Sequence, residues 1–135
     1  PALRAVSVLR HAVPSVKGIA SDIAMEGGAE VGYDRTPLHA VHSLTKLWRV
    51  VRAGLPQVTQ PLLLLHSPQD HVVPPVDSAR ILGRVSSRDV REVLLEQSYH
   101  VATLDNDADR IFEESLSFIG RLATGVGKEG TAAGG

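Results

Sequence analysis

The chain has 135 residues, a formal net charge of −1 at pH 7 and no cysteine. Its 43% of hydrophobic and 21% of charged residues are typical of a globular domain, and its charge indicates no nucleic-acid partner. The lack of cysteine excludes disulfides and thiolate metal sites and fits a cytoplasmic location, and no apolar run reaches the roughly 18 residues that a membrane span needs.

The N-terminal region is predicted to combine one helix with a long loop. Apolar residues at three-residue and four-residue spacing predict a helix over residues 2–13, which Pro14 would end. Residues 18–36 contain several glycines and no sustained period, so we interpret them as mostly loop. The chain starts at Pro1 without a methionine or an apolar signal sequence, which indicates either processing or a missing start.

A second helix is predicted over residues 38–55. Its apolar residues again recur every three or four positions, which is the pattern of an amphipathic helix, and Gly54 is placed to close it. We expect Leu47 and Trp48, on the apolar face of this helix, to pack in the core.

The second half of the chain alternates strands and helices. Residues 61–65 form a continuous apolar run, which predicts a short strand buried on both faces. A short helix over residues 76–85 and a second strand over residues 89–96 follow. A terminal helix is predicted over residues 107–123, and the Gly-rich residues 124–135 are expected to form a disordered tail. The residues expected to line the buried face of the terminal helix are Ile111, Leu116, Ile119 and Leu122.

This alternation predicts the α/β fold class with a parallel sheet. Two strands alone would leave both sheet edges open to solvent, so we expect them to be the end of a larger sheet. In open α/β sheets, functional residues lie on loops beyond the carboxyl ends of the strands. Asp70 follows the first predicted strand and His100 follows the second, so parallel neighbouring strands would let their side chains hydrogen-bond. Such a pair is two thirds of a nucleophilic triad.

Three segments resemble a known family. PLLLLHSPQDHVVPP and LEQSYHVATLDNDADRIFEESLSFI resemble the C-terminal part of the α/β-hydrolase superfamily, most of all its bacterial carboxylesterase and monoacylglycerol-lipase branch. The upstream SDI…YDRTPLHAVHSL resembles the segment that joins a small cap to the last third of the core in that branch. The resemblance covers residues 1–120.

The resemblance implies a chain organisation and two catalytic residues. The chain would be the C-terminal part of an α/β-hydrolase core, with parallel strands alternating with helices, preceded by a helical cap and connecting segment. Residues 1–42 would be the cap-derived and connecting segment, residues 43–123 the core part, and residues 124–135 the tail. Asp70 would be the triad acid and His100 the general base, with no cofactor and no metal.

The sequence departs from the family pattern at the nucleophile. It contains no G-x-S-x-G elbow and no glycine-rich oxyanion-hole loop, and neither Ser67 nor Ser98 is placed on a strand-to-helix elbow. We therefore expect the nucleophile to lie upstream of this chain. Because triad members act as a unit, we expect this chain alone to be inactive.

We expect the full-length protein to be a serine hydrolase that cleaves carboxylic esters, either small esters or acylglycerols. The N-terminal half of the hydrolase core would be the partner that supplies the nucleophile. A variant of this hypothesis has aspartate as the nucleophile, as in dehalogenase and epoxide-hydrolase relatives. The alternative is a non-catalytic α/β-hydrolase-like module that acts through a partner or as a dimer.

Other interpretations of the same residues are open to test. Asp70 could be a plain turn residue and His100 a surface histidine, although the paired motifs favour the catalytic interpretation. Asp105 and Asp107 are expected to cap the terminal helix. No metal site is expected, because the remaining histidines lack a motif such as H-E-x-x-H. These histidines are His39, His42, His66 and His71.

Overall fold

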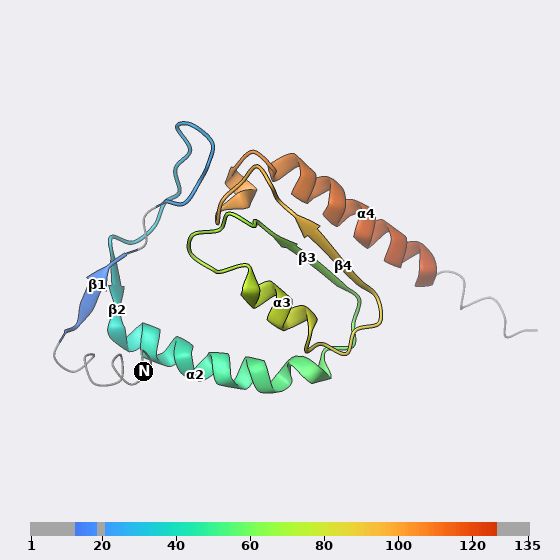
Figure 1. Cartoon of the computed structure of the whole chain (residues 1–135), viewed down its shortest axis with the longest axis horizontal. Helices are drawn as coiled ribbons and strands as arrows, with labels where there is room; N and C mark the ends of the chain where they lie inside the picture. Colours follow the sequence, from blue (N-terminus) through green and yellow to red (C-terminus); the bar gives the residue numbers. More distant parts are fainter. Residues whose placement is uncertain (1–12, 19–20, 127–135) are drawn as a thin grey trace, which may run out of the picture.

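The computed structural model describes residues 13–18 and 21–126 (Figure 1). The helix predicted over residues 2–13 therefore lies almost entirely outside the described residues, as does the predicted tail from residue 127 onwards.

The first described elements form a small antiparallel pair that the sequence analysis missed. Strand β1, Ser15–Lys17, pairs with strand β2, Arg35–Pro37, across the long loop that was expected. Three residues are too few for a periodic pattern to be recognised. Gly18 is required beside this pair, because a Cβ there would lie 2.3 Å from the carbonyl oxygen of Tyr33.

Helix α2, Leu38–Gly54, confirms the second predicted helix and its end. A single turn of 3₁₀ helix, Leu55–Gln57, follows it. The prediction that Leu47 and Trp48 pack in the core is wrong, because these side chains are 54% and 44% exposed. The face of α2 that carries them is largely uncovered by the described residues, whereas Leu38 at the start of α2 is buried.

The centre of the fold is a pair of parallel strands, β3 (Leu62–His66) and β4 (Val90–Leu94). Both strands and their parallel pairing were predicted. Helix α3, Val76–Leu82, connects them, and in the view of Figure 1 the strands lie between α3 and helix α4. The buried core consists of Val93, Leu95 and Ala102, with Leu63, Leu65 and Ile111 packed against it.

Helix α4, Ala108–Val126, is longer than predicted and includes residues 124–126 of the expected tail. Its buried side differs from the prediction, because Leu116 and Ile119 are 71% and 61% exposed. Of the predicted residues, Ile111 does pack against the core and Leu122 is half-buried, whereas Phe118, which was not predicted, is buried. Phe112, Leu116 and Ile119 share a second apolar face of α4 that is exposed in the described chain.

The predicted division of the chain agrees with where the elements lie, but its boundaries stay predictions. The β3–β4 sheet lies within residues 43–123 and the β1–β2 pair within residues 1–42. Helix α2 runs across residue 42 without a break. Over the described ranges, no helix combines the length and the apolar character needed to cross a membrane.

Candidate catalytic dyad

The parallel register brings Asp70 and His100 together at one end of the sheet. Strand β3 ends at His66, opposite Leu94 at the end of β4, so the loops that follow leave the sheet side by side. Asp70 Oδ2 lies 2.9 Å from His100 Nδ1. The two residues that the sequence analysis singled out are therefore in hydrogen-bond contact, although they are 30 positions apart.

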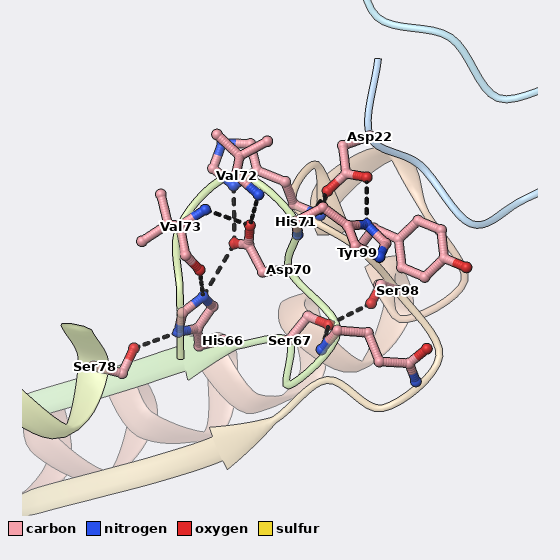
Figure 2. A network of polar contacts seen from close by, with 12 residues as sticks. Asp22, His66, Ser67, Asp70, His71, Val72, Val73, Ser78, Ser98 and Tyr99 are labelled. Carbon is pink, nitrogen blue, oxygen red and sulfur yellow. Dashed lines mark hydrogen bonds and ion pairs between the residues drawn. The ribbon is translucent and has the colours of Figure 1, made fainter. Parts of the chain in front are cut away.

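Asp70 is held as a buried carboxylate. Its side chain is only 4% exposed, and its Oδ1 accepts the backbone N–H groups of Val72 at 2.8 Å and Val73 at 2.7 Å. Burial raises the pKa of Asp70, but hydrogen bonds from His100, Val73, Val72 and His66 outweigh it and lower the pKa to about 2. The tight loop after β3 thus keeps the carboxylate ionised and fixed in orientation (Figure 2).

A second histidine contacts the same oxygen of Asp70. His66 Nε2 lies 3.0 Å from Asp70 Oδ2 and 3.1 Å from the carbonyl oxygen of Val73. Its other ring nitrogen, Nδ1, hydrogen-bonds the hydroxyl of Ser78 on α3. The sequence analysis considered His66 only as a metal ligand, although its position at the end of the strand and four residues before Asp70 could have indicated this contact.

His100 is oriented through both its ring and its main chain. Its ring turns Nδ1 toward Asp70 and leaves Nε2, on the other side of the imidazole, for a reacting group. The side chain is 38% exposed, so the ring is accessible. The backbone N–H of His100 donates to Asp22 Oδ2 at 3.1 Å, which ties the loop to a distant part of the chain.

Asp22 links the loops of the two dyad residues, and the sequence analysis did not predict this. Its Oδ2 accepts the backbone N–H of His71 at 3.2 Å as well as that of His100, and its Oδ1 lies 2.8 Å from His71 Nδ1. The carbonyl of Asp22 accepts the N–H of Val101 at 3.1 Å. Burial raises the pKa of Asp22, but the hydrogen bonds from His71 and His100 outweigh it and lower the pKa.

Asp105 and Asp107 bind the His100 loop, so the prediction that their side chains cap α4 is wrong. Asp107 Oδ2 accepts the N–H of Gln97 at 2.8 Å and the hydroxyl of Ser98 at 2.9 Å. Asp105 is 4% exposed. The N–H groups that donate to the Asp105 carboxylate belong to Ala24, Met25, Tyr99 and Asn106, at 2.7 to 2.9 Å. The carboxylates thus accept donors of the loop before α4 in place of the first N–H groups of the helix.

Ser67 and Ser98 are engaged in structural hydrogen bonds. They are 2% and 0% exposed. The Ser67 hydroxyl donates to the carbonyl of Ser98, and the Ser98 hydroxyl donates to Asp107. Neither hydroxyl is accessible to a substrate, which agrees with the expectation that neither is the nucleophile.

The described part of the chain contains no group of three or more His, Cys, Asp or Glu side chains arranged to hold a metal ion. That the protein works without a metal or another cofactor stays a prediction. What the geometry can do chemically is accept a proton at His100 Nε2 and stabilise the resulting imidazolium through Asp70.

Comparison with known proteins places this chain in a family. The serine aminopeptidase S33 family matches residues 23–107. A thermostable monoacylglycerol lipase from Bacillus sp. (strain H-257) is 38% identical over 105 residues, which are 78% of this chain and 42% of that protein. A carboxylesterase from Bacillus subtilis (strain 168) is 24% identical over 90 residues, or 67% of this chain and 37% of that protein.

Solved structures share the fold of this chain. A chain from the work on LipS and LipT, two metagenome-derived lipolytic enzymes, is 41% identical with a TM-score of 0.83, over 90% of this chain and 49% of that chain. The monoacylglycerol lipase of Paleococcus ferrophilus matches with a TM-score of 0.65 over 85% of this chain and 49% of its own, and at 17% identity it shows the fold alone. The chain thus spans less than half the length of these relatives.

Proposed function

The chain belongs to the serine aminopeptidase S33 family of α/β-hydrolases, and from this premise we propose that it is the C-terminal part of a serine hydrolase that cleaves carboxylic esters. The proposed activity is of the carboxylesterase or monoacylglycerol-lipase type. The observation that carries the proposal is the hydrogen bond between Asp70 and His100 at the carboxyl end of the parallel strands. The names of the relatives support the ester class, because they are a monoacylglycerol lipase, a carboxylesterase and lipolytic enzymes.

In the proposed mechanism, His100 is the general base and Asp70 its partner. A serine hydroxyl from an upstream segment attacks the ester carbonyl while His100 Nε2 takes its proton. The imidazolium then gives this proton to the leaving alcohol, and an acyl-enzyme remains. Water attacks the acyl-enzyme by the same route, which releases the carboxylic acid and restores the serine. Asp70 Oδ2 holds the Nδ1–H of His100 throughout and stabilises the charged ring.

The proposal needs a second part of the core, and the exposed apolar surface supports one. Phe112, Leu116 and Ile119 on α4 are each more than half exposed, and Leu47 and Trp48 on α2 are 54% and 44% exposed. An exposed apolar face on a folded domain is a site for association, and α4 and α2 each carry one. We assign these two faces to contacts with the N-terminal half of the hydrolase core, because the relatives are more than twice as long as the region they share with this chain.

The experiment starts with the protein made from its native gene. Its intact mass is measured, it is labelled with a fluorophosphonate probe that phosphonylates activated serines with loss of fluoride, and the labelled peptide is sequenced. We expect a larger product, labelled on a serine in a Gly-x-Ser-x-Gly segment, that hydrolyses p-nitrophenyl esters and a monoacylglycerol. Asp70→Asn and His100→Ala variants should lose both labelling and hydrolysis.

The same experiment separates the other hypotheses. A larger product with no label, no esterase activity and an aspartate at the elbow would favour the dehalogenase-like variant. A folded native product of 135 residues without label or hydrolysis would refute the esterase proposal and leave a non-catalytic module. The cytoplasmic location stays a prediction, which fractionation of the native cells would test.

A further inference from the structure

We propose that His66 is a positioning residue of the catalytic dyad. It donates from Nε2 to the same Asp70 oxygen that His100 uses, and so controls both the orientation of that carboxylate and the strength with which it holds His100. The catalytic part of this inference rests on the proposed function. The hydrogen-bond part does not, and it can be tested on the folded protein without any substrate.

The contacts of His66 determine its tautomer. Its Nε2 faces two oxygens that can only accept, the Asp70 carboxylate at 3.0 Å and the Val73 carbonyl at 3.1 Å, so Nε2 carries the hydrogen. Its Nδ1 faces the Ser78 hydroxyl, which donates to it. The neutral ring therefore has a partner on each side. With a side chain only 13% exposed, the ring is held between the end of β3, the Asp70 loop and α3.

The Asp70 carboxylate has donors on both oxygens. Oδ1 accepts the N–H groups of Val72 and Val73, and Oδ2 also contacts His66 Nε2 (Figure 2). His100 Nδ1 lies 2.9 Å from the same Oδ2. Rotation of the carboxylate about its Cβ–Cγ bond would break contacts on both sides at once. In the proposed reaction, the contact with His66 would thus hold Asp70 Oδ2 in its orientation toward His100.

Sharing one oxygen also changes its basicity. A donor on Oδ2 disperses the negative charge that would otherwise act on His100 alone, so it weakens the stabilisation of the His100 imidazolium. The titratable groups around the pair are His66 from β3, His71 from the Asp70 loop and Asp22, which holds the His71 ring and the His100 backbone. Removing only the His66 donor should therefore strengthen the stabilisation of the His100 imidazolium by Asp70, and it should lower the rate because Oδ2 is no longer held in place.

The test compares three side chains at residue 66 in the protein made from its native gene. Gln can place an amide N–H near the position of Nε2, whereas Asn reaches only as far as Nδ1 and Leu has no donor. We expect His66→Asn and His66→Leu to reduce kcat by about 10- to 100-fold with KM little changed, which corresponds to one hydrogen bond to a charged group. The acid limb of their pH–rate profile should move to higher pH. His66→Gln should recover most of the rate and keep the wild-type limb.

Three results would overturn the proposal. The first is a His66→Asn variant with wild-type kcat and an unshifted acid limb of the pH–rate profile. The second is a His66→Gln variant whose kcat is as low as that of His66→Leu. The third is a loss confined to KM. If His66→Leu does not fold, the comparison of His66→Gln with His66→Asn still tests the proposal, because both variants carry an amide and its NH₂ group lies at a different distance from the backbone. If the wild type has no hydrolase activity, the proposed function fails, and ¹⁵N NMR of the His66 and His100 rings still tests the shared hydrogen bond.

Discussion

Replacing the buried Asp105 with asparagine should destabilise the fold more than the same change at an exposed aspartate. The Asp105 carboxylate is 4% exposed and accepts four backbone N–H groups, two on each oxygen. Two of these donors, Ala24 and Met25, are 81 and 80 positions away in the sequence. A third donor, Tyr99, is the residue before His100. Asp105 therefore joins the N-terminal loop to the loop of the proposed general base.

The magnitude follows from counting donors. An asparagine amide has one oxygen and one NH₂ group, so whichever way it is turned, two backbone N–H groups lose their acceptor and face another donor. Each hydrogen bond to a charged group contributes about 1.5–3 kcal/mol, and neighbouring losses are not additive. We expect Asp105→Asn to lower the free energy of unfolding by about 3–5 kcal/mol. The substitution is isosteric, so no cavity contributes to this loss.

The assay is urea unfolding of the native-gene protein, followed by circular dichroism. Asp109→Asn is the matched control, because Asp109 is an exposed carboxylate in the first turn of α4 and should cost within about 1 kcal/mol through the helix dipole. Burial raises the pKa of Asp105, but its backbone hydrogen bonds outweigh it and lower the pKa below 3.8. Its contribution is therefore complete above pH 3.8 and is lost as the pH falls, so the gap between wild type and Asp105→Asn should close in acid. Equal stability of the two variants at pH 7 would refute this account of the loop.

Three further predictions concern the dyad and its supports. Asp70→Asn should keep the fold but lower kcat by about 10³- to 10⁴-fold through the wrong His100 tautomer, as steady-state ester hydrolysis would show. Folding lowers the pKa of Asp70 from 3.8 to about 2, so the ionised carboxylate stabilises the fold by about 2 kcal/mol above pH 3.8. This stabilisation is lost as the pH falls toward 2. The urea midpoint of unfolding should therefore fall less steeply over that range in Asp70→Asn than in wild type. Asp22→Asn should lower kcat and speed hydrogen exchange at the His71 and His100 amides, and unchanged exchange would argue against Asp22 as their anchor.

The exposed faces of the helices were beyond what the sequence could predict. The periodicity of α2 and α4 correctly indicated amphipathic helices, but on α4 the prediction combined Ile111, which packs against the core, with Leu116 and Ile119, which are exposed. An apolar stripe indicates that a helix face can be buried, but it does not indicate which part of the protein packs on that face. Leu116 on α4 and Trp48 on α2 thus lie on the faces of two different helices, and the described residues leave both faces open.

What the sequence determined by itself was the parallel strand pair and the contact between Asp70 and His100. Local patterns are sufficient for this, because an apolar run indicates a buried strand and parallel strands bring the loops at their carboxyl ends to one edge. Only the tertiary structure decided which groups support the pair. These groups are Asp22, His66 and Asp105, and their hydrogen-bond partners come close only after the chain folds. No periodic pattern in the sequence indicates which partner a carboxylate or an imidazole will have. The proposed dyad could thus be identified from the sequence, whereas the hydrogen bonds that hold it in place could not.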